Sequence, residues 1–486
     1  MEPQPRYGLR TMNSGPTPIQ LVDRVEEAER LRSLVADPPR LVVVRGRRRI
    51  GKSHLLNAVV TGDRVVSLHA DEQDEPAQLA MLAGEGARLL AGKPTLSFRS
   101  WDEALSFFAT QAALGPLVLI LDEFQYLCGS QPALPSIIQR HWDRWQRERT
   151  PITLILTGSA LTFMEGLLAE GAPLFGRADY RPLLPPLDYR DASAFAATDT
   201  SPTRLIERYA ILGGTPQYQV WAGARSLDRI LSELVLSPGG PLYEEPLQLL
   251  RGEEGMRSPG TYFAAMRAVA AGRTRSSEIA DAVGQRQPSV LKLLGRLREL
   301  GYLEMREPMS AGPADAVETA RQGRGVWRIA DPYFRFWFRY VFPDRSRLER
   351  GRSAEVLADI KSDLPPFVGP VFEDCCRTWV GRYAPDLAGR QSTQIGAWWS
   401  RRGDAEIDVV AAAKGAFLLV GSCKWSVRPV DASVLDQLYE HRALLGGRAA
   451  RARLALFSRS GFSEGVRARA SDEGVVLVTA ADLFED

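Results

Sequence analysis

The chain of 486 residues has little cysteine and little histidine, with four of each. The cysteines form no C-x-x-C pair and the histidines are scattered, which argues against a disulfide framework and against a zinc site. Uninterrupted apolar runs, such as Pro116 to Leu121, fall far short of the roughly 20 residues of a membrane helix. Residues 1–18 lack the apolar core of a secretory signal. These absences favour a reduced, cytoplasmic protein without a membrane partner.

Lysine is also scarce, at six positions among 61 basic residues, and arginine supplies the rest. A lysine retained against this bias indicates a need for an ammonium group. The net charge is only +2, so electrostatics of the whole chain neither demand nor exclude nucleic acid. With 45% hydrophobic and 25% charged residues, the composition is that of a globular protein, and the length predicts about three domains.

The first motif is G-x-x-x-x-G-K-S at residues 46–53, between a β-branched strand at 41–44 and a stretch of helical spacing at 54–60. This pattern predicts a phosphate-binding loop whose backbone N–H groups cradle a phosphate. Lys52 would bridge the β- and γ-oxygens of ATP, and the Ser53 hydroxyl would ligate Mg²⁺. The predicted nucleotide-binding residues of this motif are Gly46, Ile50, Gly51, Lys52, Ser53 and His54.

Polar residues follow the next two apolar strands. Asp122 and Glu123 end the strand at 117–121, and Thr157-Gly158-Ser159 ends the strand at 152–156. Strands that alternate with helices predict an α/β fold with a parallel sheet and a ligand site at the carboxyl ends of its strands. Asp122 is predicted to hold Mg²⁺, Glu123 to activate the attacking water, and Ser159 to sense the γ-phosphate.

Arg177 is the candidate arginine finger or sensor of this ATPase. A finger can act within its own chain or on a neighbouring copy, so a homo-oligomer is left open.

The later chain changes pattern several times. Residues 188–250 are mostly helical, and residues 261–304 read as helix, helix, turn, helix and strand, the order of a winged helix. The aromatic run at 333–340 predicts a buried helix, and residues 344–363 a linker or a surface helix. The expected organisation is a flexible tail (1–19), a P-loop ATPase core (20–185), a helical lid (186–258), a winged helix with the aromatic segment (259–343), a linker (344–365) and a final α/β domain (366–486).

Several motifs together resemble one family, and they are LVDR at 21–24, GRRRIGKS, LILDEFQYL, LTGSA, PLFGR, GGTP and VWRIADPYFRFWFRYVFP. This set is similar to the archaeal-type ATPase family, a branch of the P-loop ATPases related to AAA+ and STAND proteins. The resemblance covers essentially the whole chain. It implies that Arg24 lies near the adenine and that Pro216, in Gly214-Thr215-Pro216, approaches the base from the lid.

The resemblance extends to the C-terminal domain, which in that family is of unknown function and similar to PD-(D/E)XK nucleases, a restriction-endonuclease-like fold. Asp408 stands on one strand face with Glu406, and the next strand ends in Ser422-Cys423-Lys424. The nuclease pattern implies an acid at 422, and a serine hydroxyl is a poorer Mg²⁺ ligand than a carboxylate. Glu373 resembles an additional acid that could compensate. The predicted catalytic residues are therefore Glu373, Asp408 and Lys424, with Asp408 on the metal.

The long helix expected at 288–300 carries a basic face. Lys292 and Arg296 lie opposite an apolar stripe, and Gln285 to Gln287 stand at the helix entry, where a recognition helix would touch bases. This face makes DNA a candidate partner. A winged helix in such an ATPase is alternatively an internal lid or a protein contact.

The preferred hypothesis is a Mg²⁺-dependent ATPase whose nucleotide state controls a nuclease-like domain that acts on DNA. Two alternatives stay open: a STAND-like signalling switch built on a degenerate nuclease scaffold, and an ATP-responsive winged-helix transcription regulator.

Overall fold

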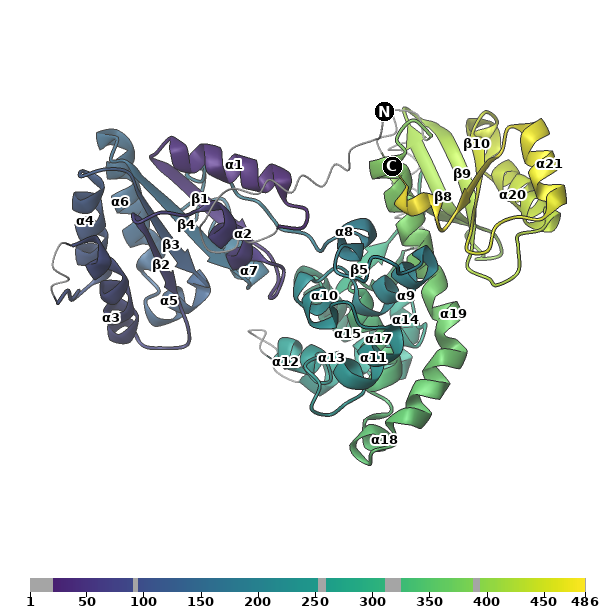
Figure 1. Cartoon of the computed structure of the whole chain (residues 1–486), viewed down its shortest axis with the longest axis horizontal. Coiled ribbons are helices and arrows are strands. Elements are labelled where there is room, and N and C mark those ends of the chain that lie inside the picture. Colours follow the sequence, from purple (N-terminus) through teal and green to yellow (C-terminus); the bar gives the residue numbers. More distant parts are fainter. Residues whose placement is uncertain (1–20, 91–94, 252–258, 311–324, 388–393, 486) are drawn as a thin grey trace. The chain divides into compact units, whose positions relative to one another are not determined.

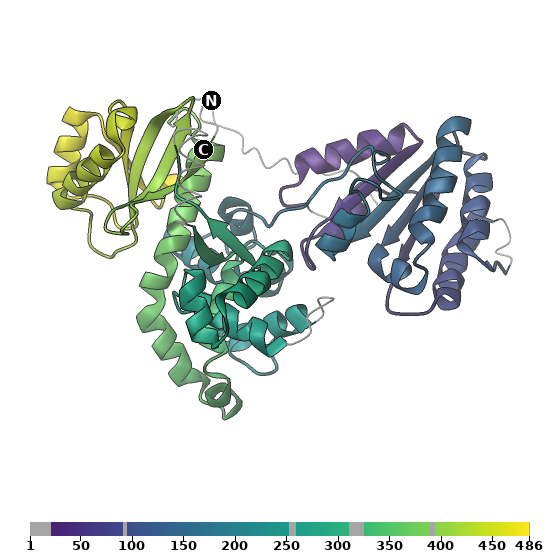
Figure 2. The same ribbon diagram turned by 180° about the vertical axis from the view of Figure 1, so that it is seen from behind.

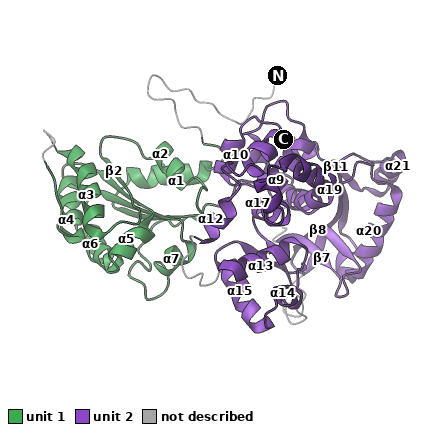
Figure 3. Ribbon diagram, turned by 90° about the horizontal axis from the view of Figure 1, so that it is seen from below, with its two compact units in different colours: residues 1–184 green, residues 185–486 purple. Residues whose placement is uncertain are grey.

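The computed structural model describes residues 21–90, 95–251, 259–310, 325–387 and 394–485. The chain divides into two compact units, with the boundary after Leu184 (Figure 3). The expected tail at 1–19 and most of the expected wing loop lie outside the described residues. No helix within the described ranges is both long and apolar enough to cross a membrane.

The first unit is built on a four-stranded parallel sheet in the order β1-β4-β3-β2. A segment at 179–184 runs along the free edge of β1, where the Val43 N–H donates to the Tyr180 carbonyl at 2.9 Å. The predicted parallel-sheet α/β core is therefore confirmed. The strands are β1 (Arg40–Arg45), β2 (Val65–His69), β3 (Leu117–Asp122) and β4 (Ile152–Gly158).

Helices cover both faces of this sheet, as Figure 1 shows. In β1, Leu41 and Val43 join one hydrophobic core while Val42 and Val44 join the other, because successive strand residues point to opposite faces. A strand that is buried on both faces has no polar side, which explains its unbroken apolar run. One face carries α1 (Val25–Ala36) and α2 (Lys52–Val59), and the other carries α3 (Glu75–Gly86), α4 (Trp101–Ala112), α5 (Phe124–Ser130), α6 (Leu134–Glu148) and α7 (Leu161–Gly166).

The second unit begins with helices, as expected for residues 188–250. They are α8 (Tyr189–Ser193), α9 (Pro202–Leu212), α10 (Pro216–Ala222), α11 (Leu227–Arg229), a π-helical stretch (Ile230–Val235) and α12 (Glu245–Arg251). Three more helices and an antiparallel ribbon follow: α13 (Pro259–Ala270), α14 (Ser276–Val283), α15 (Gln287–Glu299), β5 (Leu303–Arg306) and β6 (Val326–Ile329). This order is the one predicted from the sequence, and the name winged helix stays a prediction.

The aromatic run forms α17 (Pro332–Phe336) and a π-helical turn (Trp337–Val341), and its Trp337 is fully buried. The segment at 344–363, expected to be a linker or a surface helix, is helical: α18 (Arg345–Glu349) precedes α19 (Ser353–Thr378). Helix α19 runs for 26 residues through three prolines, which normally interrupt helices. Its buried apolar stripe, which includes Val356, Ile360 and Val371, explains why the helix persists there.

The C-terminal part is a five-stranded sheet in the order β11-β10-β9-β8-β7. Strands β7 to β9 pair antiparallel, whereas β10 pairs parallel with β9 and β11. Helix α19 packs on one face of the sheet, and α20 (Ala432–Leu444) and α21 (Glu464–Glu473) pack on the other (Figure 2). The strands are β7 (Gln394–Trp399), β8 (Glu406–Ala413), β9 (Ala416–Lys424), β10 (Arg453–Ser458) and β11 (Val476–Thr479).

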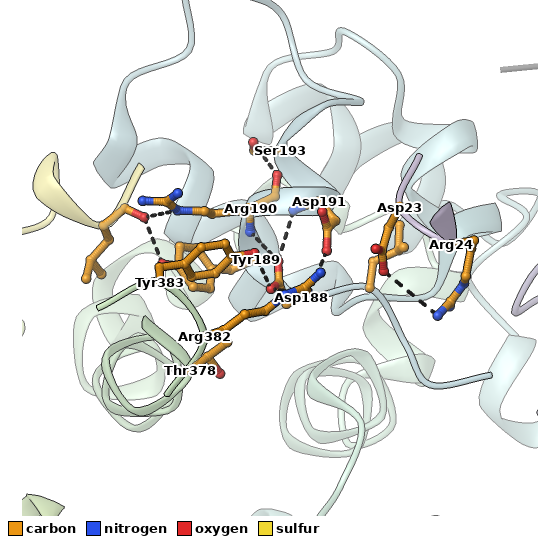
Figure 4. Close-up of polar contacts among 12 residues, drawn as sticks. Asp23, Arg24, Asp188, Tyr189, Arg190, Asp191, Ser193, Thr378, Arg382 and Tyr383 are labelled. Atoms are coloured by element: carbon orange, nitrogen blue, oxygen red, sulfur yellow. Dashed lines mark hydrogen bonds and ion pairs between the residues drawn. The ribbon is translucent and has the colours of Figure 1, made fainter. Parts of the chain in front are cut away.

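Helix α8, just after the unit boundary, is fastened to this C-terminal part (Figure 4). The Asp188 carboxylate accepts hydrogen bonds from Arg382 at 2.8 Å and from the Tyr383 hydroxyl at 2.6 Å. The Tyr189 hydroxyl donates to the Leu483 carbonyl at 2.7 Å. The first residues of the second unit are therefore bonded to the C-terminal part of the same unit.

Candidate functional site

The phosphate loop joins β1 to α2 as the motif predicted. Gly46 has no room for a side chain, because a Cβ there would lie 2.7 Å from Ile50. Gly51 has φ +94°, a left-handed conformation that favours glycine. The loop is therefore shaped for backbone N–H groups to approach a phosphate.

Lys52 is buried at the start of α2, and its ammonium donates to the Gly46 carbonyl at 2.9 Å. The same ammonium lies 3.5 Å from the Glu123 carboxylate. Burial lowers the pKa of Lys52, and the charges of Glu123 and Asp122 only partly oppose that shift.

Asp122 ends β3 and is almost fully buried. Its Oδ2 accepts a hydrogen bond from the Ser53 hydroxyl at 2.7 Å, and its Oδ1 accepts one from Thr157. Burial pushes the pKa of Asp122 upward, but hydrogen bonds from Thr157, Ser53 and His69 outweigh burial and lower it. A hydroxyl beside an ionised carboxylate is a donor set that fits Mg²⁺, as predicted for Ser53 and Asp122.

Glu123 stands at the N-terminus of α5 with φ +56°. The Ser159 hydroxyl donates to its Oε2 at 2.6 Å, and the Gln125 amide donates to the same oxygen. Burial raises the pKa of Glu123, but the charge of Lys52 and these hydrogen bonds lower it overall. An ionised, held carboxylate suits a group that accepts a proton from water. Ser159 thus contacts the predicted base itself.

Two residues at this site were missed by sequence reasoning. Gln125 links Glu123 to the Ser159 hydroxyl, which it reaches at 3.2 Å. The His69 Nδ1 lies 3.0 Å from the Asp122 carboxylate, at the rim of a cavity of about 360 Å³ that Glu123 and Arg48 also line. His69 ends β2, so recognising that strand would have placed it at the same sheet edge.

Arg177 makes two hydrogen bonds to the Asp143 carboxylate on α6, at 2.8 and 2.9 Å. The hydrogen bond and charge of Asp143 raise the pKa of Arg177. To act as a finger, this guanidinium would have to leave Asp143, and that role stays a prediction.

Arg24 and Pro216, which the resemblance assigns to the adenine, belong to different compact units of the chain. Arg24 is buried and lies 3.9 Å from Asp23 (Figure 4). It also lies 3.7 Å from Glu27. Pro216 begins α10 in the second unit. His54 is exposed on α2, and Ile50 is buried beneath the loop. Their contacts with a nucleotide stay predictions.

A second cluster of acids lies in the C-terminal sheet. Oxygen atoms of Glu373, Glu406 and Asp408 all lie within 4.8 Å of one another, and we call these residues the carboxylate cluster. A cavity of about 220 Å³ beside it is lined by Asp408, Lys424 and His441, among others. Helix α19 brings Glu373 to strand β8, so the predicted Glu373, Asp408 and Lys424 belong to one region.

The backbone of β8 is irregular at this place. The β7–β8 register shifts between Gly396 and Trp398, opposite Asp408. Such bulges re-aim side chains and are common next to active sites. Glu406, which sequence reasoning put on the face of Asp408 without a role, supplies the third carboxylate.

Ser422 stands where the nuclease pattern implies an acid. Its hydroxyl donates to the Asp408 Oδ2 at 3.1 Å, and the Cys423 N–H donates to the same oxygen at 2.7 Å. Position 422 therefore orients Asp408 instead of adding a charge.

Two acids of the carboxylate cluster have raised pKa values. Burial and the charge of Asp408 raise the pKa of Glu373 to about 8, despite the opposing charge of Arg377. Burial and the charge of Asp408 also raise the pKa of Glu406. Three crowded carboxylate oxygens are the donor set that a hard divalent cation prefers.

The expected basic face of α15 is exposed at Arg286 and Lys292, and half-buried at Arg296, which pairs with Glu299 at 3.3 Å. The opposite stripe of Val290, Leu294 and Leu297 is fully buried, as predicted.

Comparisons with known proteins match two stretches of the chain. Residues 38–192 match the AAA domain family, and residues 337–434 match a family described as archaeal and bacterial proteins of unknown function. An uncharacterized protein of Methanocaldococcus jannaschii is 27% identical over 395 residues, which cover 80% of this chain and 84% of the relative. These matches confirm the resemblance for the ATPase core and the C-terminal domain, and they leave its nuclease-like character a prediction.

Solved structures with a similar course of chain include a Walker-type ATPase of Pyrococcus abyssi, at 21% identity, with 68% of this chain and 99% of that chain covered and a TM-score of 0.48. Another is the ORC2 protein of Aeropyrum pernix, at 14% identity, with 72% and 98% covered and a TM-score of 0.44.

Proposed function

We propose that this ATPase, which joins an AAA domain to a C-terminal domain of unknown function, uses its nucleotide state to control a Mg²⁺-dependent nuclease activity on DNA. The observation that carries the proposal is the carboxylate cluster, at the start of β8 and beside Lys424, which ends the neighbouring strand β9. Hydrolysis of a phosphodiester needs carboxylates for a cation and a positive charge near the phosphate.

In the first unit, the phosphate loop and Lys52 would hold the β- and γ-phosphates of ATP. Ser53 and Asp122 would hold Mg²⁺, which supplies charge neutralisation at the phosphates when bound. Glu123 would accept the proton of the attacking water, with Ser159 and Gln125 fixing its carboxylate.

In the second unit, Glu373, Glu406 and Asp408 would hold a divalent cation, which lowers the pKa of a bound water when present. Lys424 would neutralise the scissile phosphate. Ser422 and the Cys423 N–H would orient Asp408 through their shared hydrogen bonds.

The partner proposed for the helices is DNA. Arg286, which precedes α15, and Lys292, within the helix, are exposed, and the other face of α15 is buried. Basic groups on an exposed helix can neutralise backbone phosphates and position the duplex.

The test is cleavage of double-stranded DNA, single-stranded DNA and RNA by the full chain with Mg²⁺ or Mn²⁺, with and without ATP. We expect ATP-dependent cleavage of DNA that the Asp408→Ala variant loses. Asp404→Ala is the matched control, because Asp404 is an exposed acid of the same cavity rim outside the carboxylate cluster. Cleavage that persists in Asp408→Ala, or none under any condition with ATP hydrolysis intact, would reject the nuclease.

The second candidate is a STAND-like signalling switch on a degenerate nuclease scaffold. It is favoured by Ser422, whose hydroxyl occupies the expected acid position. Such a switch would hold ATP tightly, hydrolyse it slowly and cleave nothing. Sequence-specific DNA binding without cleavage would instead select the transcription regulator.

A further inference from the structure

Next to the carboxylate cluster lies a half-buried group whose net charge is positive. Asp374 follows Glu373 on α19, and three arginine side chains bind its carboxylate. Arg306 approaches its Oδ1 at 2.6 Å, Arg377 donates to the same oxygen at 2.5 Å, and Arg328 pairs with Oδ2. Arg306 comes from β5 and Arg328 from β6, so both strands of the ribbon reach this one acid.

Arg377 connects Asp374 to the carboxylate cluster. One of its nitrogens, Nη2, binds Asp374, and the other, Nη1, donates to the main-chain carbonyl of Asp408. The same Nη1 lies 3.7 Å from the Glu373 carboxylate. Only 10% of the Arg377 side chain is exposed, so solvent does little to screen these contacts.

Three guanidinium groups surround the single negative charge of Asp374. Burial would raise the pKa of Asp374, but the charges of Arg328, Arg377 and Arg306 hold it well below its usual range. Asp374 is therefore ionised and shares its negative charge among three guanidinium groups. With Asp374 neutralised, Arg377 would be left to pair with the carboxylates of Glu373 and Asp408, and a cation would have to displace it.

We infer that Asp374 and Arg377 are positioning residues of the carboxylate cluster, and that Arg306 and Arg328 make the β5–β6 ribbon part of the same arrangement. Asp374 pairs with the positive charge of Arg377 and so holds that guanidinium away from the ligand carboxylates. Arg377 in turn binds the main-chain carbonyl of Asp408 and fixes its position. The guanidinium fork suits this double role, whereas a lysine ammonium offers no such planar pair of donors. The inference rests on the proposed function, because it assumes that the carboxylate cluster binds a divalent cation.

The test measures binding of Mn²⁺ alone to the full chain without nucleotide, and Asp408→Ala defines the binding that belongs to the cluster. We expect Asp374→Asn to weaken that binding by about tenfold, the lower end of the effect of residues that support metal ligands. Arg377→Lys should weaken it in the same direction, because the fork is lost while the charge is kept.

Asp363→Asn is the matched control. Asp363 lies on the same helix and binds Arg339 at 2.7 Å, but no contact of the described residues links it to the carboxylate cluster. The Asp363→Asn variant should change the Mn²⁺ affinity by no more than about twofold, which is less than the change expected for residues that support metal ligands. A folded Asp374→Asn variant with wild-type affinity, or an equal loss in Asp363→Asn, would overturn the inference.

Arg306→Gln is the milder variant, should Asp374→Asn fail to fold. It leaves Arg328 and Arg377 on Asp374, so a smaller loss in the same direction is expected, and wild-type affinity would again overturn the inference. If the wild-type chain shows no Mn²⁺ binding that depends on Asp408, the proposed nuclease fails together with the inference. If that binding exists and Asp374→Asn preserves it, only the inference fails.

Discussion

The two acidic sites of this molecule differ in how their charges are satisfied. In the first unit, Asp122 and Glu123 receive hydrogen bonds from Ser53, Thr157 and Ser159, and their pKa values are lowered despite burial. In the carboxylate cluster of the second unit, the acids face one another, and the pKa values of Glu373 and Glu406 are raised. The first site is preorganised around ionised acids by neutral donors and Lys52, whereas in the second site burial and mutual repulsion favour protonated acids, so a divalent cation would have to displace protons.

The largest effect expected at the first site comes from Glu123→Gln. Losing a general base lowers a rate by about 10²–10⁴-fold, so ATP hydrolysis should fall by this factor while ATP binding persists. Steady-state hydrolysis and equilibrium binding of ATP measure the two effects separately. Lys52→Ala is the contrasting variant, since it should lose tight ATP binding. Normal hydrolysis by Glu123→Gln would show that Glu123 is not the general base. The contrast between the two acidic sites would then lose its functional meaning.

At the second site, the comparison is sharpened by Ser422→Glu. A fourth carboxylate beside Asp408 adds a ligand for a cation, and we expect Mn²⁺ affinity to rise by about tenfold, or about 1.4 kcal/mol. Titration of the full chain with Mn²⁺ measures it. Ser426→Glu adds the same charge to an exposed position outside the carboxylate cluster and should change the affinity little. Equal gains in the two variants would mean that only the added charge matters.

The raised pKa of Glu373 predicts a pH dependence. Below about pH 8 this acid holds a proton that a cation must displace, so Mn²⁺ affinity should rise with pH, by up to about tenfold per unit, and level off above pH 8. Because the folded chain binds this proton more tightly than the unfolded chain does, the stability that the group contributes is lost as pH rises from 4.5 to about 8. Mn²⁺ titrations between pH 6 and pH 9 test the affinity, with Glu373→Gln as the control that should flatten the profile. A flat wild-type profile would contradict the assigned charge state.

The smallest effect concerns the basic face of α15. The double variant Lys292→Ala, Arg296→Ala should reduce, by about 2, the slope of the logarithm of the DNA-binding constant against the logarithm of the salt concentration. DNA binding at several salt concentrations measures the slope. Arg225→Ala with Arg229→Ala removes two charges from another exposed site and should leave it unchanged. An unaltered slope in the Lys292 and Arg296 variant would show that this face of α15 does not contact the DNA phosphates.

Elements with strong hydrophobic periodicity or a recognisable motif could be predicted from the sequence. The phosphate loop, β3, β4 and the buried stripe of α15 all follow from local patterns. Strands β2 and β7 were not predicted. Both lie at sheet edges, and their sequences are only partly apolar. An edge strand is defined by its partner more than by its own residues.

The candidate sites show the same limit. Lys52, Asp122 and Glu123 are named by motifs, but Gln125 and His69 become visible only when the sheet brings them to those residues. The role of Glu406 depends on the approach of α19, which brings Glu373 to the strand face that Glu406 and Asp408 share and which leaves no signal in the local sequence. Three prolines lie inside α19, where proline normally interrupts a helix, and the buried apolar stripe of α19 explains why the helix continues.

The length of α19 has a mechanical consequence. With 26 residues, the helix measures about 39 Å, and Glu373 lies some 30 Å from its first residue. Over such a lever, a tilt of about 4° displaces Glu373 by about 2 Å, ten times the deviation of about 0.2 Å that distinguishes a good metal ligand distance from a poor one. A slight change of angle at the far end of one rod would therefore suffice to assemble or dismantle the acidic centre.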